Sequence, residues 1–147
     1  MQKIVLLSGL WLLASACGRG NDVAIAPSLA AEVAGTYQTN GFLDYRCIAL
    51  PPDKMPTATL LHETDATVML TYLERYPVAK QLIISHLQLS RLPDNSIQLT
   101  EQGTVLGTVR IDRAFGTNGM ERQGLVLRLQ GTATNKETNF AFTGSKE

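Results

Sequence analysis

The chain has 147 residues, of which 44% are hydrophobic, and its 13 basic residues balance its 13 acidic ones. This length fits a single domain that can bury a sizeable apolar core. Because neither sign of charge is concentrated along the sequence, we expect no nucleic-acid groove and no polybasic membrane-binding surface.

An apolar run covers residues 4–13, directly after Lys3, and small residues then lead to Cys17. This order is typical of a secretory signal peptide, and the run is too short for the roughly 20 residues of a bilayer-spanning helix. The segment Leu13-Ala14-Ser15-Ala16-Cys17 resembles the lipobox of bacterial lipoproteins. The resemblance implies that residues 1–16 are removed and that Cys17 carries a diacylglyceryl thioether, which would attach the protein to a membrane through lipid.

The lipobox resemblance has one departure, because Ala14 stands where a leucine is usual. Cleavage after Ala16 without lipidation, and retention of the segment as an anchor helix, are therefore the alternatives. In enterobacterial lipoproteins an aspartate after the lipidated cysteine keeps the protein in the inner membrane. Gly18 occupies that position here, so the resemblance favours the outer membrane of a bacterial cell envelope.

Cys47 is the other cysteine of the chain. If Cys17 carries a thioether, Cys47 has no partner for an internal disulfide, and a lone thiol in an oxidising compartment is usually buried. We therefore expect Cys47 to be a small core residue on a strand. A reactive or intermolecular thiol is the alternative, although the neighbouring sequence offers no base to activate it.

Residues 17–34 are expected to form the lipidated N-terminus and a tether. They open with glycines and polar residues, include Pro27 and lack a strand period. A flexible chain of about 15 residues has a root-mean-square reach of about 20 Å. Ser28 can cap a helical turn that extends to Ala34.

Residues 35–147 are predicted to form an antiparallel β domain with about eight short strands. Alternating apolar and polar residues or flanking turn residues mark these strand ranges: 35–39, 57–63, 67–74, 80–91, 97–101, 105–112, 125–130 and 139–143. The period slips between Ile84 and Leu87, which predicts a β-bulge near Ser85 or His86. Residues 113–124 are predicted to be a glycine-rich loop and the longest connection of the domain, and residues 135–137 a hairpin loop.

No long helical period separates these strands, so neighbouring strands are expected to pair antiparallel in a meander. The sheet must protect its edges, which favours closure into an up-and-down barrel or curling into a sheet or sandwich. The segment Gly35-Thr36-Tyr37 resembles the Gly-x-Trp start of the lipocalins, with Tyr37 in place of the tryptophan. This resemblance implies a lipocalin-like barrel.

The sequence contains no pattern that predicts a catalytic, metal or cofactor site. The densest cluster of potential ligands is His62-Glu63-x-Asp65, in which His62 and Glu63 would point to opposite faces of a strand. His62 and His86 could converge if their strands pair, but two ligands fall short of the three that a catalytic zinc needs. We therefore predict no metal, no cofactor and no catalytic residue.

Two ion pairs are expected from the strand period, Asp44 with Arg46 and Arg110 with Asp112, because each pair places its side chains on one face. An exposed, solvated pair is the expected role for both, and the lining of a cavity is the alternative. Trp11 lies in the predicted signal peptide, so stacking on sugars would fall to tyrosines. Core or turn roles are expected for all four of them: Tyr37, Tyr45, Tyr72 and Tyr76.

These features predict a small lipid-anchored protein of the bacterial envelope whose β domain acts as a non-catalytic binding or accessory module, for which an envelope protein is one candidate partner. The alternatives are a lipocalin-like carrier of a small apolar ligand and a hydrolase whose acidic residues the sequence does not pair. A carrier needs a partly empty interior with an open mouth, whereas an accessory protein fills its core and exposes an apolar patch. The inward Leu, Ile, Val and Phe residues favour the filled core.

Overall fold

The computed structural model describes residues 26–133 and 138–146, apart from the side chains of Ala133 and Thr138. Three expected features lie outside this part of the chain: the signal peptide, the lipidation of Cys17 and the hairpin loop at residues 135–137. Its elements are α1 (Leu29–Val33), β1 (Gly35–Gln38), the 3-10 helices η1 (Tyr45–Cys47) and η2 (Pro52–Lys54), β2 (Thr57–Thr64), β3 (Thr67–Glu74), β4 (Lys80–Arg91), β5 (Ile97–Glu101), β6 (Thr104–Phe115), β7 (Glu121–Ala133) and β8 (Thr138–Lys146). None of the described helices is long and apolar enough to cross a membrane.

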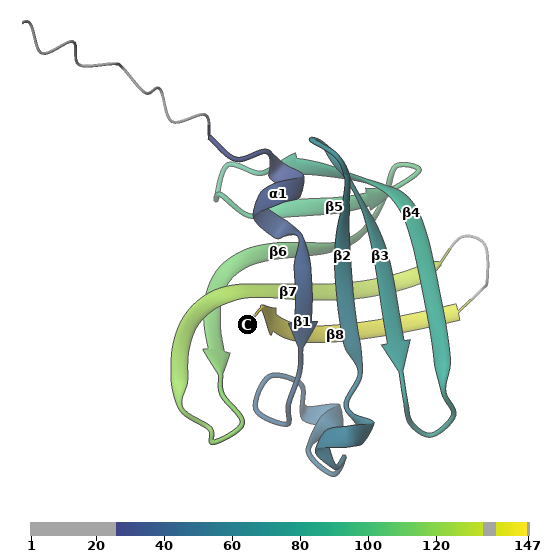
Figure 1. The fold of residues 1–147 in the computed structure, drawn as a ribbon, viewed down its shortest axis with the longest axis vertical. Coiled ribbons are helices and arrows are strands. Elements are labelled where there is room, and N and C mark those ends of the chain that lie inside the picture. Colours follow the sequence, from purple (N-terminus) through teal and green to yellow (C-terminus); the bar gives the residue numbers. More distant parts are fainter. Residues whose placement is uncertain (1–25, 134–137, 147) are drawn as a thin grey trace, which may run out of the picture.

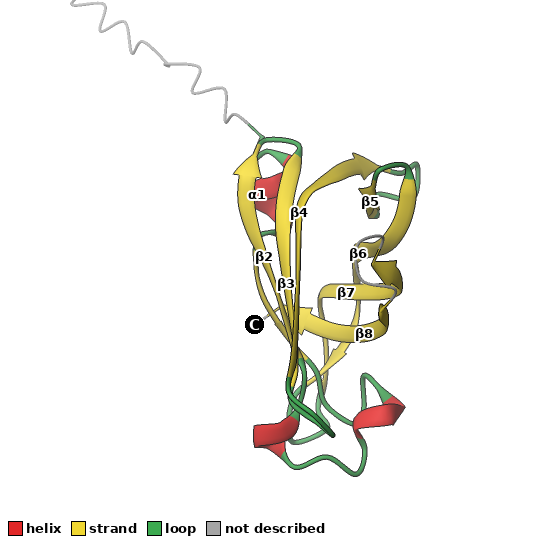
Figure 2. Ribbon diagram, turned by 90° about the vertical axis from the view of Figure 1, so that its right-hand side faces the viewer, coloured by secondary structure: helices red, strands yellow, loops and turns green. Residues whose placement is uncertain are grey.

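The eight strands form one closed antiparallel barrel in the order β1 to β8, which confirms the predicted all-β meander. Each strand pairs with its neighbour along the chain, and β1 closes the barrel by pairing with β8. From the side, β2, β3 and β4 form one wall and β5 to β8 form the other (Figures 1 and 2). This is the up-and-down architecture that the lipocalin resemblance implied.

The closure between β1 and β8 is short. Two residue pairs join the strands, Tyr37 with Lys146 and Gln38 with Ser145. Because β1 ends at Gln38, the first part of β8 has no strand on that side.

The predicted bulge lies in β4. The register between β3 and β4 shifts between Val68, which pairs with Leu87, and Leu70, which pairs with Ile84. His86 lies within this irregularity and has a φ of 58°. The extra residue returns Leu87 to the inner face, so Leu87 and Ile84 are both buried.

Side chains from all eight strands meet in the barrel interior. The Tyr72 ring packs against Phe140 and Phe142, with ring centroids 5.9 Å apart in both pairs. The packing is tight enough that a Cβ added at Gly144 would lie 2.4 Å from the Phe142 ring and 2.7 Å from the carbonyl oxygen of Gln38. Aliphatic residues complete this core, including Leu60, Leu70, Leu99, Leu106, Leu127 and Leu129.

Helix α1 packs at one end of the barrel, where the described chain begins (Figure 1). The hydroxyl oxygen of Ser28 caps it by accepting a hydrogen bond from the N–H of Ala31 at 3.2 Å, which confirms the predicted helical turn. Ala30 and Val33 are 0% exposed, and the Tyr37 hydroxyl donates to the carbonyl oxygen of Val33 at 2.7 Å. The packed part of the chain therefore includes the last residues of the expected tether.

The prediction for residues 113–124 was wrong. β6 continues to Phe115 and β7 begins at Glu121, so that Arg113 pairs with Gln123 and residues 116–120 alone form the turn. Polar residues and glycines follow Ala114 and Phe115, and they obscured the strand period at this end of the hairpin. The longest connection between described strands is residues 39–56.

Two local predictions also need correction. The register of β5 and β6 shifts between Leu99 and Thr100. In the predicted strand 105–112, Leu106 and Val109 are both buried while Val105 is 47% exposed, so the regular alternation expected there does not hold. Cys47 is buried as expected, at 3% exposure, but it lies in η1 rather than on a strand.

Candidate functional site

The connection of residues 39–56 builds the end of the barrel opposite α1 (Figure 1). Asn40 fixes the start of this loop, because its side-chain oxygen accepts a hydrogen bond from the N–H of Phe42 at 3.0 Å. The amide nitrogen of Asn40 also donates to the carbonyl oxygen of Phe115 at 2.8 Å. The loop is thereby attached to the tip of the β6–β7 hairpin.

Asp44 attaches the same loop to the unpaired side of β8. Its carboxylate is 4% exposed and accepts three hydrogen bonds from Arg46, from the backbone N–H at 3.1 Å, from Nε at 2.8 Å and from Nη2. It also accepts a hydrogen bond from the backbone N–H of Thr143. Burial alone would raise the pKa of Asp44, but these hydrogen bonds and the Arg46 charge hold it below its usual value. The predicted contact between Asp44 and Arg46 is confirmed, but it lies at the start of η1 rather than on a strand. The expected exposed, solvated role was wrong for this pair, because the Asp44 carboxylate is buried.

Cys47 and Tyr72 interact electrostatically with this ion pair. Burial raises the pKa of the Cys47 thiol, and burial together with the charge of Glu74 raises the pKa of Tyr72 to about 12. At neutral pH both groups therefore stay protonated while Asp44 stays ionised. A general acid or base works best with a pKa near the operating pH, so these shifts favour a structural role for the cluster.

We call the end formed by residues 39–56, 75–79 and 116–120 the distal end. It carries a groove of about 790 Å³, the distal groove, whose apolar walls include Phe42, Ile48 and Met55. Phe42 is braced by Phe115, with ring centroids 6.1 Å apart. The groove is therefore built on a fixed aromatic contact.

Arg75 supports another side of the distal groove. It lines the groove, and its Nη1 donates to the carbonyl oxygen of Met55 at 2.7 Å. This bond ties the loop of residues 39–56 to the end of β3. The groove walls are thus joined to two hairpins of the barrel.

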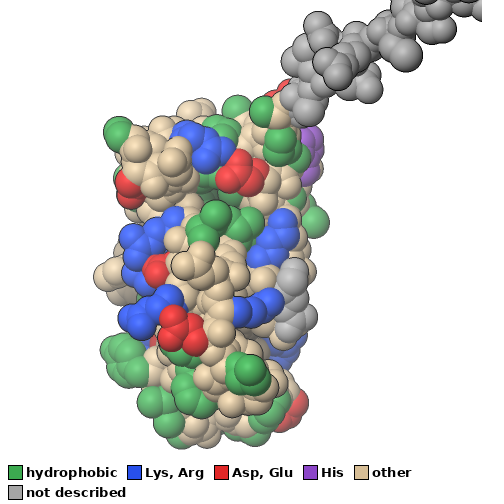
Figure 3. Space-filling model, turned by 90° about the vertical axis from the view of Figure 1, so that its left-hand side faces the viewer, with side chains coloured by type: hydrophobic (Ala, Val, Ile, Leu, Met, Phe, Trp, Pro, Cys, Tyr) green, Lys and Arg blue, Asp and Glu red, His purple; other side chains and the backbone are tan. Residues whose placement is uncertain are grey.

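The distal end gathers most of the exposed apolar side chains. Among the described residues, ten large hydrophobic side chains are exposed, and six belong to the distal end: Phe42, Tyr45, Ile48, Tyr76, Val78 and Met120. Hydrophobic side chains are also conspicuous at the lower end of the face in Figure 3. Single exposed apolar residues are ordinary, whereas a patch beside a groove marks an interaction site.

A second groove, the lateral groove, lies between residues 43–46 and the outer face of β6, β7 and β8. It has a volume of about 570 Å³. Polar residues form much of its lining: Tyr45, Arg46, Thr108, Arg128, Gln130 and Thr143.

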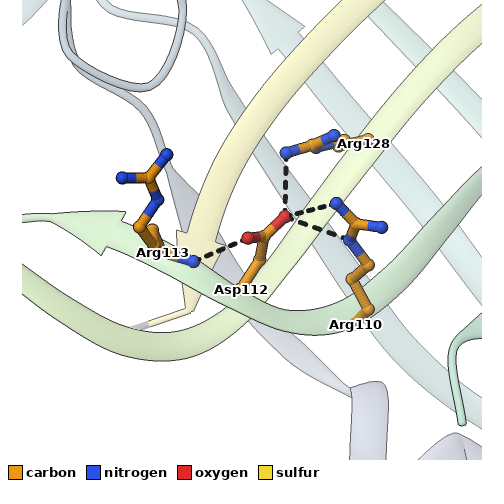
Figure 4. Close-up of polar contacts among 4 residues, drawn as sticks. All are labelled: Arg110, Asp112, Arg113 and Arg128. Carbon is orange, nitrogen blue, oxygen red and sulfur yellow. Dashed lines mark hydrogen bonds and ion pairs between the residues drawn. The ribbon is translucent and has the colours of Figure 1, made fainter.

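Arg128 is held in the wall of the lateral groove by Asp112 (Figure 4). The Asp112 carboxylate accepts hydrogen bonds from Nη2 of Arg128 at 2.9 Å and Nη2 of Arg110 at 2.6 Å, and from the N–H of Arg113 at 2.8 Å. The side-chain bond from Arg110 and the backbone bond from Arg113 lower the pKa of Asp112. The predicted Arg110–Asp112 pair is confirmed. Arg128 joins it because of the register between β6 and β7, which the sequence did not reveal.

The strands of the two histidines do not pair, because β3 lies between β2 and β4, and each histidine lies beside a different carboxylate. Nε2 of His62 lies 3.8 Å from Oδ1 of Asp65, and Nδ1 of His86 lies 3.4 Å from Oε2 of Glu63. Over residues 26–133 and 138–146, no three His, Cys, Asp or Glu side chains are grouped closely enough to hold a metal ion.

The tyrosines divide into two pairs. Tyr37 and Tyr72 are buried in the core, whereas Tyr45 and Tyr76 are 79% and 54% exposed in the distal loops. Tyr45 lines the lateral groove. It is therefore the tyrosine whose ring is available beside a cavity.

Comparison with models of protein families, with curated proteins and with solved structures finds no match to this chain. The geometry of the two grooves is therefore the basis on which a function can be assigned.

Proposed function

We propose that this protein is a lipid-anchored accessory protein of a bacterial envelope, and that its β-barrel binds a partner protein through the distal groove. The observation that carries the proposal is the concentration of exposed apolar side chains at one end of the barrel, where two of them, Phe42 and Ile48, line the distal groove. Burial of apolar surface drives most protein association, at about 25 cal/mol per Å². The partner would insert apolar side chains between Phe42, Ile48 and Met55.

A protein fits the distal groove better than a small apolar ligand does. The groove volume falls within the range of about 300–1,000 Å³ that small molecules use, but such sites bury at least about 70% of the ligand surface. Here Phe42 and Ile48 remain 62% and 72% exposed, so the groove walls stay open to solvent. The interior, where a lipocalin-like carrier would hold its ligand, contains the packed rings of Tyr72, Phe140 and Phe142.

The position of the distal end suits an anchored protein. The described chain begins at the opposite end of the barrel, beside α1 (Figure 1). With lipid on Cys17, the membrane would lie on the α1 side and the distal end would face away from it. Two or more acyl chains would hold the protein durably at the membrane. Because the distal end would face away from that membrane, the proposed partner would approach from the aqueous side.

Native mass spectrometry of the full-length protein, extracted from its own envelope in mild detergent, tests this proposal. We expect a stoichiometric protein partner, which is lost in Ile48→Asp and retained in Ile83→Asp. Ile83 is the matched control because it is 51% exposed on β4, outside the distal groove. A bound mass of a few hundred daltons instead of a protein would favour the carrier, and an unaccompanied protein or equal loss in both variants would also contradict the proposal.

A further inference from the structure

The lateral groove suggests a second binding site that does not depend on the distal groove. Two of its arginines are held by carboxylates, Arg46 by Asp44 and Arg128 by Asp112. Both remain accessible, with side chains 43% and 52% exposed. A guanidinium has five N–H donors, and the bonds to these carboxylates use only some of them. The remaining donors are presented from side chains that are already ordered, which lowers the entropic cost of binding an anion.

The arginines of this groove offer hydrogen-bond donors to an anionic ligand. Arg46 and Arg128 line the groove and are paired with Asp44 and Asp112, and Arg110 is a further guanidinium that pairs with Asp112 and also interacts with the carboxylate of Asp94. Asp44 and Asp112 have lowered pKa values and stay ionised at neutral pH, so each keeps its arginine in place while part of the guanidinium remains exposed.

The strands that surround the lateral groove belong to a part of the chain with more basic than acidic residues. From Thr104 to Lys146 the sequence has six basic and three acidic residues, whereas from Ala26 to Gly103 it has five basic and eight acidic ones. The charge is thus divided between two parts of the barrel, which the near-neutral total concealed. Basic side chains are prominent across the middle of the face in Figure 3. A positive surface raises the local concentration of anions and speeds their encounter.

The neutral groups of the lateral groove favour a sugar as the carrier of that anion. The hydroxyls of Thr108 and Thr143 and the amide of Gln130 supply both donors and acceptors, as ring hydroxyls require. The exposed Tyr45 ring offers a flat apolar surface at the edge of the groove. An acidic peptide would also place carboxylates on the two arginines. It would form fewer hydrogen bonds with the hydroxyl and amide groups of the groove than a sugar would.

We propose that the lateral groove binds an oligosaccharide that carries carboxylate groups, with Arg46 and Arg128 contacting carboxylates and Tyr45 stacking on a sugar ring. The planar guanidinium fork matches the two oxygens of a carboxylate and gives charge-assisted hydrogen bonds. The attraction would weaken as ionic strength rises, because the groove is open to solvent.

Isothermal titration of the full-length protein in mild detergent tests this site, with an oligomer of galacturonate as the probe. We expect binding with a Kd below about 1 mM at low salt. Neutral maltotetraose and inorganic phosphate should bind at least about tenfold more weakly, since each offers only part of the recognised chemistry. No binding of the galacturonate oligomer, equal binding of maltotetraose or phosphate, or tighter binding of an oligoglutamate peptide would overturn the assignment.

Variants locate the binding in the lateral groove. Arg128→Gln should weaken galacturonate binding at least about tenfold, and Tyr45→Ala several-fold. Arg91→Gln is the matched control, because Arg91 also pairs with a carboxylate, that of Glu32, but lies outside the groove. If Arg128→Gln unfolds, Arg128→Lys keeps the charge without the planar fork and should still weaken binding. Unchanged affinity in the folded Arg128 variant, or an equal loss in Arg91→Gln, would contradict the proposal.

Discussion

Asp44 and Thr143 join the longest described loop to the barrel where its closure is shortest. The buried carboxylate of Asp44 accepts a hydrogen bond from the backbone N–H of Thr143 on β8, beyond the point at which β1 stops pairing. The Asp44 carboxylate thus interacts with a backbone N–H of β8 on the side where no neighbouring strand pairs with it. It also holds Arg46, so one residue links barrel closure to the lateral groove.

Asp44→Asn should lower the free energy of unfolding by about 2 kcal/mol, because hydrogen bonds to a charged group contribute roughly 1.5–3 kcal/mol. The variant keeps the size of the side chain but removes the negative charge with which Arg46 and the Thr143 N–H interact. Urea unfolding measures the change. Asp53→Asn is the control in the same loop, since the Asp53 side chain is 73% exposed, and it should leave stability within about 0.5 kcal/mol of the wild type. Equal stabilities for wild type and Asp44→Asn would show that the carboxylate does not secure the loop.

The contribution of Asp44 should depend on pH in the acid range. Its pKa in the folded protein lies below the ordinary value of 3.8, so folding favours the ionised form. The stability it adds is therefore complete above the unfolded-state pKa and is lost as the pH falls through the folded-state pKa. We expect the stability difference between wild type and Asp44→Asn to stay constant from about pH 7 to about pH 5 and to shrink below about pH 4. Unfolding curves at a series of pH values measure it, and a difference that persists at about pH 2 would contradict this explanation.

Gly144→Ala should destabilise the barrel by about 1–3 kcal/mol, the usual cost of overpacking a filled core. The added Cβ would meet the Phe142 ring and the carbonyl oxygen of Gln38, both closer than van der Waals contact allows. Gly124→Ala is the matched control, because its Cβ would meet the Ala114 side chain at an ordinary 3.7 Å. Thermal unfolding compares the two. Equal melting temperatures would indicate room in the interior and would revive the carrier hypothesis.

Cys17→Ala should abolish membrane attachment without changing the fold. The lipobox resemblance of Leu13 to Cys17 is the basis of this prediction, and two or more acyl chains are needed for durable anchoring. Phase partitioning of the full-length protein in detergent measures it, with the wild type in the detergent phase and the variant in the aqueous phase. Cys47→Ala controls for loss of a thiol and should partition like the wild type. An aqueous wild-type protein would contradict the anchor.

Much of the fold could be predicted because its strands have one solvent-exposed face and one buried face. The alternation in residues 67–74 and the slip before Leu87 correctly gave β3 and the bulge at His86. The alternation failed where strands extend past the core. In residues 113–124, Ala114 and Phe115 are followed mainly by polar residues and glycines, so only the pairing of Arg113 with Gln123 reveals the β6–β7 hairpin.

The candidate sites were harder to predict because they depend on contacts between distant residues. Local spacing gave the Asp44–Arg46 and Arg110–Asp112 pairs, since each lies within one short segment. Nothing local connects Arg128 with Asp112. Likewise, the apolar residues of the 39–56 loop have no regular period, so their gathering at one end of the barrel became evident only in three dimensions.

Site-specific photo-crosslinking in intact cells tests whether a partner protein binds in the distal groove. A photoreactive phenylalanine derivative replaces Ile48 in the distal groove in one strain and Ile83 on the outer face of β4 in another. We predict a discrete protein adduct from position 48 and none from position 83. An absence of protein adducts at position 48, or the same adducts at both positions, would contradict a partner bound in the distal groove.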